Sequence, residues 1–200
     1  MAGVVPTKGN LMALGRTLTL ARMGYDLMDR KRNILIREMM RLIDDAAELQ
    51  GRIDSTFAEA YQALQTANIV MGTCRDLAES MPVDNSAQIR FRSVMGVEIP
   101  YVTADGAPPS APLGFVSTTS DFDRAVDRFG KVKRLVTELA EVETATYRLA
   151  YAIKKTQKRA NALQNVIIPD LTAKVEFITG ALEEKEREEF VRMKVIKARG

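Results

Sequence analysis

The chain has 200 residues, of which 46% are hydrophobic and 28% are charged, and its formal net charge is +3. It contains no histidine and a single cysteine, Cys74, which excludes imidazole bases, histidine-ligated metals, disulfide frameworks and cysteine-rich zinc sites. The hydrophobic fraction excludes wholesale disorder, and no uncharged run reaches the roughly 20 residues of a membrane span. We find no catalytic, metal-ligating or cofactor-binding set, and we expect a non-catalytic protein in a reducing, cytoplasmic setting.

The positions of proline divide the chain into two long stretches. Pro6 lies at the start, and five further prolines lie in the middle: Pro82, Pro100, Pro108, Pro109 and Pro112. Between them, residues 7–81 and 113–200 contain only Pro169. Because proline costs roughly 3 kcal/mol inside a helix, both stretches are predicted to be long helices. We therefore expect a mainly α protein with one elongated domain: an N-terminal helix (1–80), a middle segment (81–119) and a C-terminal helix (120–200).

Apolar residues recur every seven positions in both stretches, as in the seam of a coiled coil. In the N-terminal stretch only Arg32 and Thr56 interrupt the two apolar rows. In the C-terminal stretch the rows continue one residue late beyond Ile167, beside Pro169, where we expect a kink or local unwinding. These rows predict a long antiparallel two-helix coiled coil. Its main seam residues are Leu11, Leu14, Leu18, Leu35, Leu42, Leu49, Ile53, Val132, Leu135, Leu139, Leu149, Ile153, Leu163 and Ile167.

Each long helix has a candidate N-cap. Thr7 follows Pro6 at the first helix, and Ser120 is followed three residues later by Asp123 at the second. Hydroxyl side chains at these positions accept hydrogen bonds from the first free N–H groups of a helix.

The middle segment is predicted to contain a short β-hairpin. Apolar residues alternate there with arginine and glutamate on both sides of Met95-Gly96, which can form the turn. Two strands alone are marginally stable, so the hairpin must pack on the helices or on a partner. The candidate hairpin residues are Ile89, Phe91, Val97 and Ile99.

An antiparallel fold makes the numbers of paired residues add to roughly 195 to 205, and it brings distant charges together. The acidic patch of Asp44, Asp45 and Glu48 then lies near the basic run of Lys154, Lys155, Lys158 and Arg159, which is one way to fix the register. Both runs can equally be solvated helix faces.

The same folding brings the basic residues near both termini to one end of the coil, and such an end can contact an acidic partner surface. No aromatic residue alternates with these cations as in a base-stacking platform, so a protein partner is favoured over nucleic acid. The candidate partner contacts are Lys8, Arg16, Arg192, Lys194 and Lys197.

Several strings are distinctive beyond their periodicity. They are Leu18-Thr19-Leu20-Ala21-Arg22, residues 29–38, residues 156–169 with Asn161-Ala162-Leu163 and Ile168-Pro169, and residues 186–194. In order and over nearly the whole chain, they resemble the D subunit of the V-type and archaeal-type rotary ATPases. Ala160 and Gln164 depart mildly from the family pattern, which more often has valine and glutamate there.

This resemblance implies the role of a central rotor shaft. The end holding both termini would insert into the ring of catalytic A and B subunits, and the hairpin end would lie near the base of that ring. The small F subunit would bind the side of the coil, and a funnel-shaped subunit would link it to the membrane ring on the cytoplasmic side. Because such a shaft rotates within the ring, we expect its contacts with the ring to be weak and polar and not strongly apolar.

Two other classes of protein fit the helical pattern without the resemblance. One is a free-standing coiled-coil interaction protein, such as a chaperone or a tether. The other is a nucleic-acid-binding helical arm. Co-purification with the catalytic-ring subunits and the F subunit separates the rotor from both, whereas salt-sensitive retention on nucleic acid favours the second.

Overall fold

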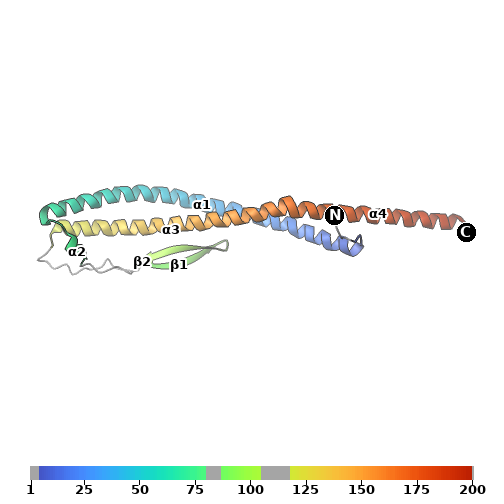
Figure 1. Cartoon of the computed structure of the whole chain (residues 1–200), viewed down its shortest axis with the longest axis horizontal. Helices are drawn as coiled ribbons and strands as arrows, with labels where there is room; N and C mark the ends of the chain where they lie inside the picture. The colour runs from blue at the N-terminus through green and yellow to red at the C-terminus, as the bar shows by residue number, and fades with distance from the viewer. Residues whose placement is uncertain (1–4, 80–86, 105–117, 200) are drawn as a thin grey trace. The chain divides into compact units, whose positions relative to one another are not determined.

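The computed structural model describes residues 5–79, 87–104 and 118–199. Its elements are α1 (Lys8–Met71), α2 (Arg75–Glu79), β1 (Ala87–Val94), β2 (Val97–Ala104), α3 (Ser120–Ala162), a π-helical turn (Leu163–Ile167) and α4 (Ile168–Arg199). The long N-terminal helix packs against the long C-terminal helical stretch, and the β-hairpin lies between them in the sequence (Figure 1). The predicted fold class is confirmed.

The chain forms two compact units. Unit 1 comprises Met1–Ile34 and Ile153–Gly200, and unit 2 comprises Leu35–Ala152. Each unit contains a part of the N-terminal helix and a part of the C-terminal helical stretch. The division into three segments stays a prediction, because its boundary at 80/81 and four of the middle prolines (Pro82, Pro108, Pro109 and Pro112) lie outside the described residues.

Hydrogen bonds at the helix starts test the two predicted caps. The N–H of Asn10 donates to Oγ1 of Thr7 at 3.2 Å, so Thr7 is confirmed as the N-cap of α1. At α3 the N–H groups of Phe122 and Asp123 both donate to the carbonyl of Thr119, at 3.0 and 3.2 Å. Thr119 therefore supplies the first carbonyl acceptor, and Ser120 is the first residue of α3. The helix begins one residue earlier than it would with Ser120 as the N-cap.

The end of α1 depends on a glycine. Gly72 has φ +77°, a left-handed conformation that glycine adopts without a Cβ clash, and its N–H donates to the carbonyl of Asn68 at 2.9 Å. This geometry closes the last turn of α1. Just beyond it Cys74 is buried with Ala67 of α1 and Phe122 of α3, so the thiol is a packing group.

The apolar rows lie on the buried side of the helices. The predicted seam residues that are buried are Leu35, Leu42, Ile53, Val132 and Leu149. Those that are half-buried are Leu11, Leu14, Leu18, Leu49, Leu135, Leu139, Ile153 and Leu163. Small residues at Ala60 and Ala67 are also buried and continue the N-terminal row. Mutual burial of these rows is the main favourable contribution to the pairing of the helices.

Polar pairs between the helices show the antiparallel register within each unit. The pairs are Lys8 with Glu186 and Arg32 with Gln157 in unit 1, and Glu59 with Arg128 in unit 2. Their residue numbers add to 194, 189 and 187, which is below the predicted range. Asp44, Asp45 and Glu48 belong to unit 2, whereas the basic run 154–159 belongs to unit 1. The pairing of that acidic patch with the basic run therefore stays a prediction.

The arginine that interrupts the N-terminal seam row has a specific set of partners in unit 1. Arg32 donates from Nη1 to Oε1 of Gln157 at 2.7 Å and from Nη2 to Oδ1 of Asp29 at 2.6 Å. Gln157 in turn donates from Nε2 to Oδ1 of Asn161 at 2.8 Å. A polar residue within an apolar seam of this kind favours one register, since any shift leaves its groups without partners.

We expect Arg32→Ala to destabilise the protein by about 1–2 kcal/mol, because it leaves the half-buried Gln157 amide without its cross-helix partner. For a chain of this length that corresponds to a fall in Tm of a few degrees, measurable by circular dichroism. Arg30→Ala, which removes an exposed arginine of the same helix, is the control. Equal melting curves for the two variants would contradict a role for Arg32 in the register.

The one-residue slip of the C-terminal rows has a structural cause in the π-helical turn. The N–H of Ile168 bonds to the carbonyl of Leu163, five residues earlier, so the turn holds one residue more than an α-helical turn. The predicted local unwinding is confirmed. Ile167, which the sequence predicts as a seam residue, is 42% exposed, and Leu171 and Ile178 are the buried residues beyond the turn. Pro169, which has no N–H, follows the turn directly.

The hairpin has the predicted two-residue turn. Val94 pairs with Val97 and Ala87 with Ala104, and the turn residues Met95 (φ 51°) and Gly96 (φ 74°) are both left-handed. Positive φ at both central residues is the signature of a type I′ turn, whose twist matches that of the strands.

The register divides the four candidate hairpin residues between the two faces of the hairpin. Phe91 lies opposite Pro100 and Ile99 lies opposite Arg92, so Ile89 and Phe91 share one face while Val97 and Ile99 share the other. Ile99 is completely buried, whereas Ile89 and Phe91 are 66% and 55% exposed.

Strand β2 attaches the hairpin to α3 within unit 2. The N–H of Val102 donates to Oε2 of Glu141 at 2.8 Å, and Nη1 of Arg148 donates to the carbonyl of Glu98 at 3.1 Å. The Arg148 guanidinium also lies 5.3 Å from the centroid of the Phe91 ring, a cation–π contact. The helix therefore supplies the support that two strands need.

We expect Met95→Asn to stabilise the hairpin by about 1 kcal/mol, because asparagine tolerates the left-handed conformation better than methionine. Amide exchange in the β1–β2 ladder should slow about fivefold. Gly96→Ala is the opposing variant: a Cβ at φ +74° is strained, and exchange should become faster. Exchange rates that do not change in either variant would contradict this role of the turn.

Candidate functional site

A groove of about 490 Å³ lies between α1 and α3 in unit 2. Its lining combines four cationic side chains, two carboxylates, two hydroxyls and one leucine. The lining residues are Arg52, Ser55, Thr56, Glu59, Arg128, Lys131, Arg134, Leu135 and Glu138. Cations therefore outnumber carboxylates by two in the lining of this groove.

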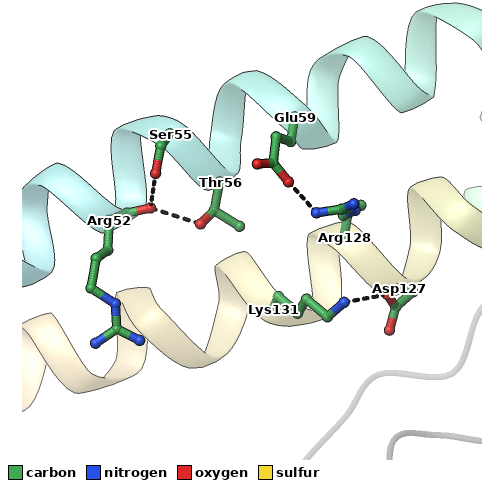
Figure 2. Close-up of polar contacts among 7 residues, drawn as sticks. All are labelled: Arg52, Ser55, Thr56, Glu59, Asp127, Arg128 and Lys131. Carbon is green, nitrogen blue, oxygen red and sulfur yellow. Dashed lines mark hydrogen bonds and ion pairs between the residues drawn. The ribbon is translucent and has the colours of Figure 1, made fainter.

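Figure 2 shows how side chains from the two helices are held around the groove. Arg128 of α3 forms an ion pair with Glu59 of α1, and Lys131 pairs with Asp127 on its own helix at 2.7 Å. The hydroxyls of Ser55 and Thr56 both donate to the carbonyl of Arg52, at 2.9 and 2.7 Å. Thr56 thus satisfies its hydrogen bond locally although it interrupts the apolar row.

The carboxylate of Asp127 reports the local electrostatic field. Its pKa lies below the usual value of 3.8, chiefly because Lys131 donates a hydrogen bond to it, and the charges of Lys131, Arg128 and Arg134 add to the effect. Partial desolvation opposes the shift. Because the pKa of Asp127 is lower in the folded than in the unfolded state, this carboxylate stabilises the fold at pH values above its unfolded-state pKa. The stabilisation is lost as the pH falls through its folded-state pKa.

We expect Lys131→Met to raise the pKa of Asp127 back toward 3.8, because the hydrogen-bond donor and the nearest charge are both removed. Carboxyl carbon chemical shifts followed by NMR over the acidic range measure this directly. Lys155→Met, which replaces an exposed lysine of unit 1, is the control and should leave the titration unchanged. A titration of Asp127 that is the same in both variants would show that Lys131 does not hold it.

The candidate partner contacts near the termini lie in unit 1, and two of them have partners within the chain. Lys8 pairs with Glu186 at 3.0 Å, and this hydrogen bond raises the pKa of the lysine. Arg192 pairs with Glu188 at 3.6 Å. The remaining candidates, Arg16, Lys194 and Lys197, are exposed.

The end of α4 extends beyond the start of α1 (Figure 1). Lys8 is the first residue of α1 and pairs with Glu186, whereas α4 continues to Arg199. Residues 183–199 are all exposed. We call residues 187–199 the projecting segment; its exposed large apolar side chains are Phe190, Val191, Met193, Val195 and Ile196.

A second exposed apolar stripe lies on α1 in unit 1. Leu20, Met23 and Leu27 follow helical spacing, and Met12 precedes them on the same helix. All four are more than 45% exposed. Neither apolar surface was predicted from the sequence, although the signal was available: these residues lie outside the seam rows and recur at helical intervals.

Two further kinds of feature are absent from residues 5–79, 87–104 and 118–199. In these ranges no group of three or more histidine, cysteine, aspartate or glutamate side chains is placed to hold a metal ion. No helix in the same ranges has a stretch long and apolar enough to cross a membrane.

A pair of long helices with this much uncovered apolar surface belongs to the class of subunits that partner proteins cover in a larger assembly. Comparison with known proteins identifies the assembly. The family model described as the D subunit of ATP synthase matches residues 10–198. This chain therefore belongs to the D-subunit family of the V/A-type ATP synthases, as its sequence strings indicated.

Curated relatives match over nearly their whole length. The D subunit of the V-type ATP synthase of Thermotoga neapolitana is 44% identical over 97% of both chains. The D subunit of the A-type ATP synthase of Thermococcus kodakarensis is 37% identical, covering 99% of this chain and 95% of the relative. That of Pyrococcus furiosus is 35% identical, over 98% and 94%.

Proposed function

We propose that this chain is the central rotor shaft of a V/A-type ATP synthase. It transmits torque between the ring of catalytic A and B subunits and the membrane ring that translocates ions, and it performs no chemistry itself. Family membership supports a place in the complex. The observation that best supports the shaft role is the projecting segment, a single helix with exposed apolar and basic side chains that extends beyond the paired helices of unit 1.

Transmission of torque requires that two helices turn together. Burial of the seam rows resists separation, and cross-helix contacts in both units resist sliding: Arg32 with Gln157 in unit 1 and Glu59 with Arg128 in unit 2. A single long helix lacks both restraints. This combination suits an element that is twisted at one end and resisted at the other.

The projecting segment is proposed to insert into the catalytic ring. The family resemblance implies weak polar contacts there, but the exposed Phe190, Met193 and Ile196 favour a mixed contact, in which apolar side chains fill the central opening. The basic residues Lys194 and Lys197 lie among them and would meet acidic groups of the ring. Lys8 and Arg192 are less available, because each already pairs with a glutamate.

The remaining partners are proposed from the family resemblance. The F subunit binds the side of the helical pair, and a funnel-shaped subunit joins it to the membrane ring. The chain thus lies on the cytoplasmic side of the membrane as a peripheral part of the complex, with no direct membrane insertion and no nucleic acid partner. The exposed side chains of Ile89 and Phe91 in the hairpin are a further candidate contact near the base of the catalytic ring.

We expect Arg192→Gln, Lys194→Gln and Lys197→Gln together to weaken coupling, so that more ATP is hydrolysed for each ion pumped. The physical reason is that the projecting segment loses the charges that orient it against acidic groups of the ring, whereas glutamine preserves its helical conformation. The measurement is the ratio of pumping to hydrolysis in reconstituted complexes. Co-purification with the A and B subunits is measured first, since a chaperone, a tether or a nucleic-acid arm would not retain them.

A matched triple variant separates position from charge. Lys154→Gln, Lys155→Gln and Lys158→Gln removes three exposed charges from the same unit, away from the projecting segment. Its coupling ratio should stay at the wild-type value. If the terminal triple variant pumps as efficiently as wild type, or if the two triples lose coupling equally, the proposed insertion of the projecting segment is wrong.

A further inference from the structure

The groove between α1 and α3 is a cationic feature that the rotor role does not use. Its cations come from both helices: Arg52 from α1, and Arg128, Lys131 and Arg134 from α3. They lie well away in sequence from both ends of the chain. The groove is built entirely within unit 2, so its geometry does not depend on the placement of unit 1.

Two of these arginines have no carboxylate partner in the described part of the chain. Arg128 pairs with Glu59, and Lys131 pairs with Asp127. In residues 5–79, 87–104 and 118–199, no carboxylate lies within ion-pair distance of the guanidinium of Arg52 or Arg134. Their donors are therefore available to an external anion.

The groove is also polar where the seam would otherwise be apolar. Thr56 stands in the apolar row of α1, and together with Ser55 it lines the groove between the two helices. Both hydroxyls donate to the Arg52 carbonyl, so they do not compete for the arginine donors. The pKa of Asp127 is lowered chiefly by its hydrogen bond from Lys131, and the charges of Lys131, Arg128 and Arg134 act in the same direction.

We propose that this groove binds a phosphate-bearing small molecule, with Arg52, Lys131 and Arg134 as its principal ligands. Guanidinium groups match the oxygens of a phosphate with two parallel hydrogen bonds, and an ammonium adds a mobile point charge. The volume of about 490 Å³ lies within the range of small-molecule sites, roughly 300–1,000 Å³. A phosphate is favoured over a carboxylate, because it has more acceptor oxygens and can bind guanidinium groups from both helices at once.

Binding at this site has a mechanical consequence. An anion held by Arg52 on one side and by Lys131 and Arg134 on the other bridges α1 and α3 through a new set of charged hydrogen bonds. It therefore stabilises the paired state of unit 2, since a ligand that binds only the folded form raises its stability. Anion binding in this groove does not depend on the rotor function, because it needs only the two helices and their side chains.

The test uses the full chain and three probes: inorganic phosphate, pyrophosphate and ATP. Thermal melting is followed at constant ionic strength, with sodium chloride as the reference. We expect a saturable rise in Tm with at least one probe, and phosphorus NMR of that probe should show line broadening on addition of protein. A response to phosphate and pyrophosphate assigns the site to the free anions, whereas a response to ATP alone assigns it to nucleotides.

Two variants and a control make the test specific. Arg52→Gln and Arg134→Gln, both at exposed positions, should each weaken the apparent affinity at least tenfold. Arg124→Gln removes an exposed arginine of α3 that does not line the groove, and it should bind like wild type.

Three results would overturn the proposal. The first is a Tm that is unchanged by all three probes relative to chloride, with sharp phosphorus signals. The second is equal loss of affinity in Arg134→Gln and Arg124→Gln. The third is a rise in Tm with a poly-glutamate peptide but with none of the phosphates, which would assign the groove to an acidic protein segment.

Discussion

Neither long helix of this protein can bury its apolar rows without the other. Leu35 and Leu42 of the N-terminal seam and Leu149 of the C-terminal seam are all buried, because the two helices pack against each other. A helix exposed alone in water gains little from intrinsic propensity, so its stability comes from packing of this face. Mutual burial is therefore the constraint on which the other features depend: the hairpin rests on α3, and the groove exists only where the helices are paired.

The two polar residues that interrupt the N-terminal seam show two uses of the same departure from pattern. Arg32 is held by a glutamine from the opposite helix, and its hydrogen bonds select a register that apolar contacts alone specify poorly. The Thr56 hydroxyl donates its hydrogen bond to a carbonyl of its own helix, so Thr56 contributes a polar surface to the groove, beside cations from both helices. Arg32 thus links the two helices through hydrogen bonds, whereas Thr56 lines a groove between them that solvent and solutes can enter.

Much of the fold could be predicted from periodicity and from the positions of proline and glycine. Proline positions indicated the long helices, Met95-Gly96 indicated the turn, and the strings around Asn161 and Pro169 indicated the family. The register could not be predicted, because it depends on the geometry of residues between the helices, and a seven-residue repeat allows pairing at several offsets. The groove was hidden for a different reason: Arg52 and Arg134 lie far apart in the sequence, and nothing local marks either as unusual. The exposed stripe of Leu20, Met23 and Leu27 was less hidden, since its spacing is visible without the structure.

The π-helical turn at Leu163–Ile167 limits the insertions and deletions that the helix tolerates. By holding one extra residue, it rotates everything after it by about 100° relative to an uninterrupted α-helix, and that rotation brings Leu171 and Ile178 onto the buried side. Loss of one residue within the turn would restore regular hydrogen bonding, yet it would turn both side chains toward water. The most irregular part of the helix is therefore the part whose length is least free to vary.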